Sequence, residues 1–233
     1  MPRSVAIVQS NYIPWKGYFD LIASVDEVIL LDDVQYTRQD WRNRNRIKVP
    51  QGLHWLTIPV PVKGRLSRRI CDTEIGDSGW ARRHWKTIQS AYSRAAHYSD
   101  FVDLFEELYL DCRETLLSKI NYRFLSAICG ELGITTELSW SMDYSATGYR
   151  TERLVSLCGQ AGATEYVSGP AAKAYFDEKR FARAGIAVRW FDYSGYPEYR
   201  QLFPPFEHSV SVVDLLLNEG QAARSFMKCG RQG

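Results

Sequence analysis

One loop of the sequence combines amide, phenol and indole side chains at a place where ligands often bind. It reads QSNYIPWKGYFD, follows an apolar run at residues 5–8, and presents Gln9, Tyr12, Trp15 and Tyr18. The amide of Gln9 can both donate and accept hydrogen bonds, which suits it to orient a ligand. The helix expected after this loop has free backbone N–H groups at its start, and such groups bind anions. We therefore predict that the loop binds substrate, although Trp15 and Tyr18 could instead close the top of a sheet.

A second apolar run ends in LLDDVQYTRQDWRNRNRIK, the richest stretch of polar side chains in the chain. Asp32 directly follows the apolar residues, so we expect it at the carboxyl end of a buried strand. A carboxylate there can act as a general base or bind hydroxyl and amine groups of a substrate. The alternative is that Asp32 only caps the turn that follows the strand.

The rest of this stretch offers the groups that bind a nucleotide or a phosphorylated sugar. An indole can stack on a flat ring while a guanidinium holds phosphate oxygens. We therefore predict a phosphate-binding pocket near Arg44. Its candidate binding residues are Gln35, Tyr36, Trp41, Asn43 and Arg44.

Two further segments carry candidate residues. Among the four histidines, His84 is the best candidate for an acid or base. It shares a helical stripe with Trp80 and Ile88 and so borders the core face. A structural histidine on the core face of that helix is the alternative. Ser168 and Gly169 lie at another expected strand end, and Pro170 begins the helix that follows.

The common signatures of enzymes and metal sites are missing from the sequence. It has no GxSxG, GxxxxGK[ST], GxGxxG, HExxH or HxGH motif. The five cysteines are odd in number, widely scattered and without CxxC spacing, so we expect neither a disulfide framework nor a metal site. Cys129 and Cys158 fit helical core positions.

Basic residues are concentrated in one part of the chain. Residues 38–94 hold thirteen Lys and Arg against four Asp and Glu, whereas residues 101–150 hold four against eight. This excess predicts an anionic partner, or only a solvated basic face. Without a nucleic-acid motif, a phosphate-bearing small molecule or a phosphopantetheinyl carrier protein fits better than nucleic acid.

Length and composition indicate a folded globular protein with a substantial core. The chain has 233 residues, of which 45% are hydrophobic and 24% charged. No apolar run approaches the ~20 residues of a membrane span, and residues 1–17 lack the features of a secretory signal. We therefore expect a cytoplasmic protein with no membrane contact. The sequence does not fix its oligomeric state.

Alternation of strand and helix patterns predicts an α/β fold in one domain, residues 1–233. We expect a mainly parallel sheet flanked by helices, with strands at residues 4–9, 27–31, 135–140, 165–168 and 186–191 and helices at 17–24, 151–161, 176–184 and 210–217. Residues 46–60 predict an inserted β-hairpin that turns at Gln51 and Gly52. Two amphipathic helices, one carrying residues 81–92 and the other spanning 111–130, make a helical middle section.

Seven blocks of the sequence match one known family in register. They are QSNYIPWKGYFDLI, VDEVILLDDVQYTRQDWRNRNRIK, HWLTIPV, WARRHWKTIQSAY, EYVSG, AYFDEKRFARAGIAV and YPEYRQLFPPFEHSVSVVDLLLNEG. On these blocks the chain resembles the WbqC-like protein family over nearly its whole length. It departs from the family pattern where Gln9 is followed by Ser10 in place of proline. By motif, the resemblance adds Tyr199 and Gln201 to the candidate substrate-binding residues.

The resemblance implies a bacterial protein of O-antigen or related polysaccharide biosynthesis that attaches an acyl or aminoacyl group, such as glycyl, to an amine. Our leading hypothesis is an amide-forming transferase that acts on a nucleotide-linked amino sugar, with Asp32 or His84 as the base. The sequence requires no cofactor, and a carrier-protein thioester would be the donor. Two alternatives stay open: an ATP-dependent amide ligase on a nucleotidylyltransferase-like fold, and a non-catalytic module that binds a sugar nucleotide or a carrier protein.

Overall fold

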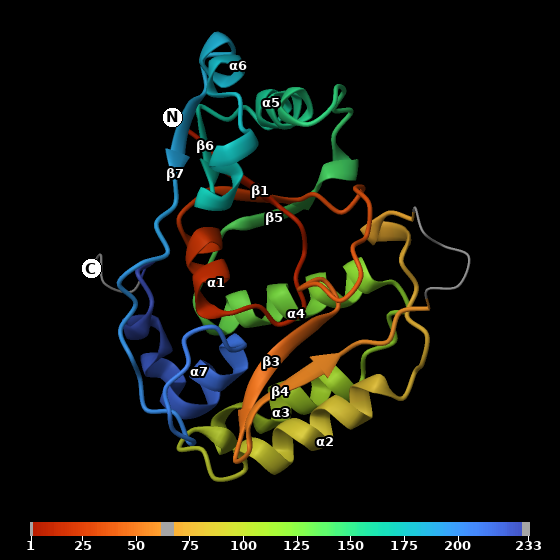
Figure 1. Cartoon of the computed structure of the whole chain (residues 1–233), viewed down its shortest axis with the longest axis vertical. Coiled ribbons are helices and arrows are strands. Elements are labelled where there is room, and N and C mark those ends of the chain that lie inside the picture. The colour runs from red at the N-terminus through yellow and green to blue at the C-terminus, as the bar shows by residue number, and fades with distance from the viewer. Residues whose placement is uncertain (1, 62–67, 230–233) are drawn as a thin grey trace.

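A five-stranded parallel sheet organises the chain, as a computed structural model that describes residues 2–61 and 68–229 shows (Figure 1). The strands are β1 (Ser4–Val8), β2 (Glu27–Leu30), β5 (Glu137–Trp140), β6 (Glu165–Ser168) and β7 (Ala187–Trp190), in the order β5-β2-β1-β6-β7. β1 pairs with β2 on one side and with β6 on the other. The two ends of the chain therefore share one sheet, and the predicted α/β class is confirmed.

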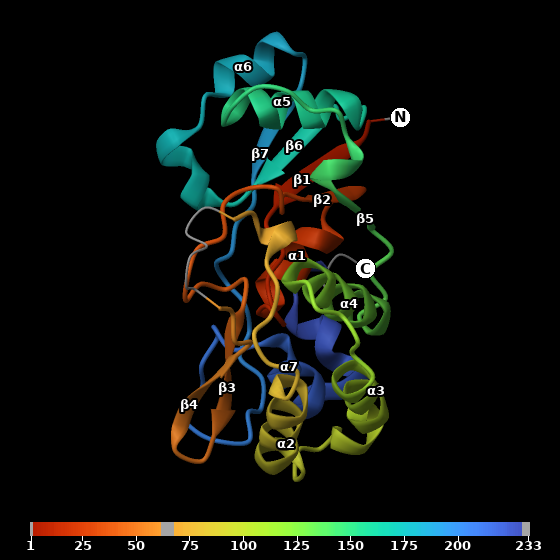
Figure 2. The ribbon, with the colours of Figure 1, turned by 90° about the vertical axis from the view of Figure 1, so that its right-hand side faces the viewer.

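The central strands are apolar because both faces of the sheet are covered. Ala6, Val28 and Leu30 belong to a large hydrophobic core together with α1 (Lys16–Ala23) and α4 (Leu117–Glu131). Val5 and Ile29 point the other way, into a smaller core with α5 (Thr151–Gln160) and α6 (Glu178–Arg183). In Figures 1 and 2, α5 and α6 accordingly lie on the opposite side of the sheet from α1 and α4.

The predicted hairpin forms a separate antiparallel pair, β3 (Arg44–Val49) and β4 (Gly52–Thr57). Gly52 closes the turn with a φ of 116°, a value that favours glycine. The inner residues Asn45 and Ile47 are buried, whereas five of the six residues of β4 are exposed. Figure 2 shows the hairpin on one side of the molecule, beside α2 (Trp80–Tyr92) and α7 (Val212–Glu219).

The helical middle section contains one helix more than the sequence reading predicts. The additional helix is α3 (Tyr98–Leu110), which buries Phe101, Phe105 and Tyr109 on one stripe. The helix predicted from residue 111 begins only at Leu117. The backbone just before Leu117 is extended, because residues 115–117 form backbone hydrogen bonds with residues 73–75.

Residues 2–61 and 68–229 include no helix that is both long and apolar enough to cross a membrane. Cys129 and Cys158 are buried as free thiols. The described residues contain no group of three or more His, Cys, Asp or Glu side chains placed to hold a metal ion.

Candidate functional site

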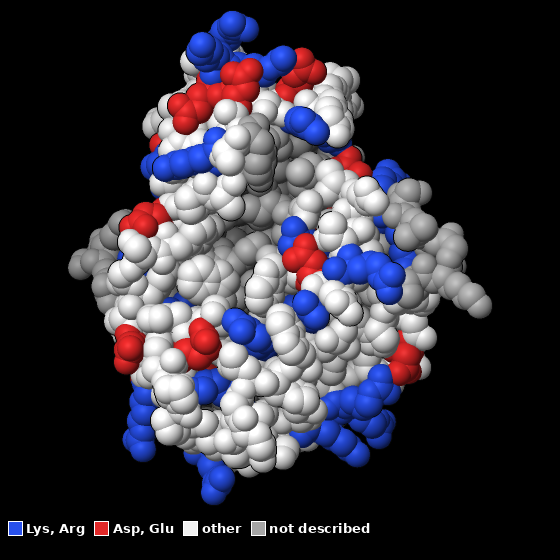
Figure 3. All heavy atoms as spheres, in the orientation of Figure 1, with Lys and Arg blue, Asp and Glu red and all other residues white. Residues whose placement is uncertain are grey.

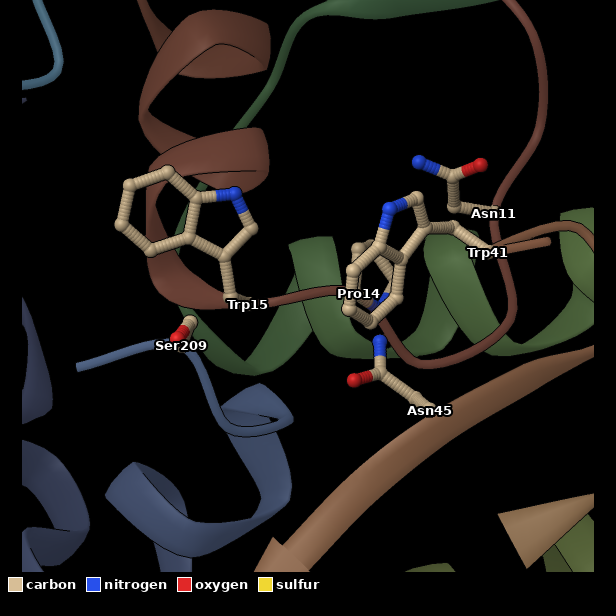
Figure 4. Close-up of a pocket in the computed structure, with 6 residues that line it drawn as sticks. All are labelled: Asn11, Pro14, Trp15, Trp41, Asn45 and Ser209. Atoms are coloured by element: carbon tan, nitrogen blue, oxygen red, sulfur yellow. The ribbon is translucent and has the colours of Figure 1, made fainter. Parts of the chain in front are cut away.

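A small pocket lies between the two loops that the sequence singles out. Its cavity volume is about 210 Å³. Trp15 comes from the loop between β1 and α1, and Trp41 comes from the loop that enters β3 (Figure 4). Figure 3 shows that this face of the molecule is hollowed across its middle. The lining residues are Asn11, Pro14, Trp15, Trp41, Asn45 and Ser209.

Backbone contacts hold the loop between β1 and α1 in a strained shape. Ile13 has a φ of 36°, a left-handed value that a β-branched residue rarely adopts. The Nδ2 of Asn45 compensates by donating to the carbonyls of Tyr12 and Ile13, at 3.1 and 3.0 Å. The backbone N–H of Tyr12 also donates to the carbonyl of Trp41, at 2.9 Å. The two loops are therefore fixed to each other beside the pocket.

Gly17 makes room for the indole of Trp15. A Cβ at position 17 would lie 2.3 Å from an atom of that ring. On its other sides the indole packs against Tyr193 and Tyr196, with ring centroids 5.6 and 5.4 Å away. The glycine therefore sets where one wall of the pocket stands.

Asp32 lies beneath this loop and is fully buried. Its carboxylate accepts a hydrogen bond from the backbone N–H of Ser10 at 2.9 Å and another from the Ser118 hydroxyl. Burial raises the pKa of Asp32, and the hydrogen bonds from Ser118 and Ser10 oppose that shift. A buried carboxyl with a raised pKa is typical of groups that act as acids or bases. Asp32, however, does not line the pocket.

Asn121 of α4 extends the Asp32 contacts to the second loop. Its Nδ2 donates to the Ser10 hydroxyl at 3.0 Å and to the carbonyl of Arg42 at 2.9 Å. The Arg42 guanidinium in turn donates to the Oδ1 of Asn11 at 3.2 Å and to the side-chain oxygen of Gln9. The predicted residues Gln9 and Asp32 therefore belong to one network that positions the pocket loop.

His84 occupies a different place, in an aromatic core cluster under the hairpin. Its Nδ1 is 2.9 Å from the Tyr12 hydroxyl, and its Nε2 is 3.2 Å from the carbonyl of Thr57. The carbonyl requires a donor, so Nε2 carries the proton and Nδ1 accepts from Tyr12. Tyr12 also bonds to Tyr109, with the two hydroxyl oxygens 2.7 Å apart. Burial lowers the pKa of His84 to about 4, so its ring is neutral near pH 7.

The arginines of β3 lie on the outer side of the hairpin. Arg46 donates to the carbonyl and hydroxyl of Ser209, at 3.2 and 3.0 Å, so it borders the pocket. Arg44 instead lies over the ring of Trp55, with its Cζ 4.2 Å from the ring centroid. Arg44 does not line the cavity beside Trp41, and phosphate binding near Arg44 stays a prediction. In the hairpin register Arg46 pairs with Trp55 and Arg44 pairs with Thr57, so Arg44 reaches the Trp55 ring diagonally across the two strands.

Tyr199 and Gln201 form a separate buried network around Asp214. The Tyr199 hydroxyl and the Gln201 Nε2 donate to Asp214 at 2.7 and 2.9 Å. The ammonium of Lys48 donates to the Oε1 of Gln201 at 3.1 Å, which ties β3 to α7. Burial raises the pKa of Asp214. These two predicted residues support the hairpin and do not line the pocket.

The remaining predicted residues do not line the pocket. The Tyr18 hydroxyl donates to the carbonyl of Gln9 at 2.9 Å, and the Asn43 amide donates to the carbonyl of Ile58 at 2.8 Å. Gly169 faces Tyr193, the neighbour of Trp15, since a Cβ at Gly169 would lie 3.4 Å from that ring. Gln35 is exposed, whereas Tyr36 and Ser168 are buried.

Sequence reasoning missed several residues that shape the pocket. Asn11 and Asn45 both lie in the two loop sequences that supplied the other candidates. The alternation of inner and outer residues along β3 was the signal for Asn45, which is on the inner side. Ser209 and Asn121 gave no local signal, because they reach the pocket region from about 200 and about 110 residues away through tertiary packing.

Comparisons with known proteins address the family. The sequence pattern of the WbqC-like protein family matches residues 9–226. The chain belongs to the WbqC-like protein family. It is also 54% identical over 230 residues to a protein of Mycobacterium tuberculosis named "Uncharacterized protein Rv1507c", an alignment that covers 99% of this chain and 100% of that protein. No solved structure matches this WbqC-like chain.

Proposed function

We propose that this WbqC-like protein binds a nucleotide-linked amino sugar and transfers an acyl or aminoacyl group, such as glycyl, to its amine. The observation that carries the proposal is the pocket between Trp15 and Trp41 with arginines at its edge. The product would be an amide-substituted sugar for O-antigen or a related polysaccharide. The transfer of the acyl or aminoacyl group is what the family resemblance implies, and the pocket adds the argument for the nucleotide.

The pocket has the size and walls for one flat ring. Drug-sized ligands occupy about 300–1,000 Å³, whereas this cavity holds about 210 Å³. Indoles bind nucleobases by stacking, at about 1–3 kcal/mol per base. Asn11 adds a polar group at the ring edge, because Arg42 engages its oxygen and leaves its NH₂ as donor. We assign the ring of the nucleotide to this pocket and the rest of the substrate to the open face beside it.

Two guanidinium groups beside the pocket are the candidates to bind the phosphates of such a ligand. Arg46 is anchored to Ser209, and Arg42 is anchored to Asn11 and Gln9. Charged hydrogen bonds between guanidinium and phosphate are among the stronger polar contacts in proteins. The pocket and the two arginines together favour a phosphorylated ring compound over a neutral sugar.

The transfer step follows from amide chemistry. The free amine attacks the carbonyl carbon of a thioester, the C–N bond forms, and the C–S bond breaks to release the thiol. The ammonium form of the amine must first lose its proton to a base. Asp32, whose pKa is raised by burial, and His84 are the candidates from the sequence, and the role of each stays a prediction.

A non-catalytic binding module is the second candidate, and one observation favours it. Asp32 and His84 are both buried and hydrogen-bonded within the protein, so neither contacts the pocket. A protein that only binds the sugar nucleotide needs no base at that place.

Titration with nucleoside diphosphates, nucleotide-linked amino sugars and ATP separates these functions. We expect binding of the first two classes. Incubation of the bound amino sugar with glycyl and acyl thioesters, followed by mass spectrometry, then tests transfer. Amide product supports the transferase, whereas binding without product for any donor supports the module. Binding of ATP alone would favour the ligase.

A further inference from the structure

The hairpin carries an exposed apolar surface next to the pocket. Five large hydrophobic side chains are exposed among the described residues, and three of them, Trp41, Leu53 and Trp55, are 39–42% exposed and lie on or beside this hairpin. We call Arg44, Leu53 and Trp55 the hairpin face. Trp41 joins this face to the pocket, because its ring centroid is 5.6 Å from that of Trp55.

Arg44 provides a positive charge on this face that is fixed in place. Its guanidinium lies over Trp55, at 4.2 Å from the ring centroid. Within residues 2–61 and 68–229, its Nε is buried without a hydrogen-bond partner, and the nearby carboxylate of Asp40 forms its ion pair with Arg42. A guanidinium that is ordered by stacking but not paired can bind an anionic partner at a small cost in conformational entropy.

The surrounding sequence makes the whole hairpin region positive. Residues 38–61 contain five Lys and Arg but a single acidic residue, Asp40. Asp40 is already engaged, since it accepts hydrogen bonds from Thr37 and from the backbone of Trp41. Charge complementarity therefore calls for an acidic partner.

The shape of the face favours a protein over a small ligand or a nucleic acid. Small ligands bind in concave sites, and no residue of the hairpin face lines the pocket beside it. Bases of a single strand stack on open aromatic faces. The ring of Trp55 is instead occupied by Arg44 at 4.2 Å, Arg46 at 5.6 Å and Trp41 at 5.6 Å. Two partly exposed indoles, Leu53 and a guanidinium without an ion pair among the described residues suit an amphipathic acidic helix.

We propose that the hairpin face is the docking surface for an acidic phosphopantetheinyl carrier protein that delivers the acyl group. This inference rests on the proposed function, because a carrier is needed only if an acyl group is transferred in the adjacent pocket. The face is continuous with that pocket through Trp41, so a flexible thioester arm can reach from one to the other. A face of three side chains is small, and small interfaces are typical of transient complexes. A transient complex suits a donor that must dissociate after each transfer.

Titration of the protein with a holo acyl carrier protein tests the proposal. We expect measurable binding that weakens as salt rises, because charged groups make part of the contact. Arg44→Glu and, separately, Leu53→Asp should each weaken carrier binding about tenfold or more, whereas Arg44→Lys should keep part of it. Arg113→Glu is the matched control, since Arg113 is 84% exposed and lies outside the hairpin. It should leave carrier binding unchanged.

The same variants are titrated with the nucleoside diphosphate that binds the wild-type protein. Because Arg44 and Leu53 do not line the pocket, their variants should keep nucleotide affinity. Nucleotide binding without carrier binding would overturn the docking surface and leave the proposed function standing. Carrier binding that Arg44→Glu and Leu53→Asp do not weaken would also overturn it. Binding of a single-stranded oligonucleotide or of a second copy of this chain to the hairpin face, in place of the carrier protein, would overturn the docking proposal as well. Carrier binding without nucleotide binding would support the docking surface and contradict the proposed function.

Discussion

The backbone N–H of Ser10 donates a 2.9 Å hydrogen bond to the carboxylate of Asp32, and this bond links the loop after β1 to the end of β2. Asn121 holds the hydroxyl of the same serine and the carbonyl of Arg42. A proline at position 10 could not donate this bond. In this chain, a buried carboxylate and a serine therefore help to set the geometry of the pocket loop.

Asp32→Asn should preserve the fold and keep nucleotide affinity within about threefold, because an amide oxygen can still accept from Ser10 and the NH₂ can donate to Ser118. Asp32→Ala leaves both donors without a partner and should cost about 1–3 kcal/mol for each group. Chemical unfolding and calorimetric titration measure these effects. Turnover of the Asn variant assigns the role: a loss of about a hundredfold or more identifies a base, whereas an unchanged rate leaves Asp32 as a positioning residue.

Stability should depend on pH through Asp32 in a defined direction. Its folded-state pKa is raised above the unfolded value near 3.8, so the folded protein binds the proton more tightly. The stabilisation of the fold by protonated Asp32 is therefore complete below the unfolded value near 3.8. It is lost as the pH rises through the folded-state pKa. The difference in unfolding free energy between Asp32→Asn and the normal protein should grow over this range in favour of the variant. A difference that is independent of pH would contradict the burial effect.

His84 should stabilise the protein with the opposite dependence on pH. Its pKa is lowered from 6.5 to about 4 by burial, so its contribution is present above pH 6.5 and is lost as pH falls towards 4. The loss should be on the order of 3 kcal/mol. His84→Gln should remove this part of the pH dependence in thermal unfolding from pH 7.5 to 4. His208→Gln, at an exposed position outside this cluster, is the matched control. An identical pH profile for His84→Gln would contradict the buried neutral ring.

Gly17→Ala should move one wall of the pocket without adding a group to its lining. The added Cβ would collide with the Trp15 indole at 2.3 Å, so the ring must shift and nucleotide affinity should fall about tenfold. Gly130→Ala is the matched control, because a Cβ at this helical glycine meets no atom within 4 Å. The control should keep its affinity and gain roughly 0.5–1 kcal/mol of stability from helix propensity. Equal affinity in both variants would show that the position of Trp15 does not matter.

Arg46→Ala should weaken binding of a phosphorylated ligand by about 1.5–3 kcal/mol, the range for a hydrogen bond to a charged group. Binding of the corresponding nucleoside without phosphates should change little. Arg44→Ala on the same strand is the control for nucleotide affinity, because Arg44 lies over Trp55 and outside the pocket. If Arg44→Ala weakens nucleotide binding and Arg46→Ala does not, the assignment of the phosphate contact must be reversed.

Local patterns were sufficient to predict the parallel sheet, the hairpin and the two loops that bear Trp15 and Trp41. In an alternating α/β pattern, apolar runs of four or five residues favour buried strands, and the polar residues after them are then expected at the strand ends. The helix α3 was missed although Phe101, Phe105 and Tyr109 share one face. The extended backbone before Leu117 depends on pairing with residues 73–75, which no local pattern shows.

The details of the site depend on contacts between distant segments. His84 was the best titratable candidate by residue type, but its place depends on Tyr12 and Thr57, which pack around it in three dimensions. Tyr199 and Gln201 similarly acquire their hydrogen-bonding partner Asp214 only in the folded chain. Residue type therefore predicted where polar groups gather, and tertiary packing decided which of them face a ligand.

Fluorescence titration of the normal protein and Trp41→Ala with a nucleoside diphosphate tests the central claim most directly. Trp41 forms a wall of the pocket and is 39% exposed, so its removal should not unfold the protein. We predict that the normal protein binds and that Trp41→Ala binds about 5- to 150-fold more weakly, the equivalent of 1–3 kcal/mol of stacking. Equal affinity of the two proteins, or no binding of any nucleoside diphosphate to the normal protein, would contradict the account.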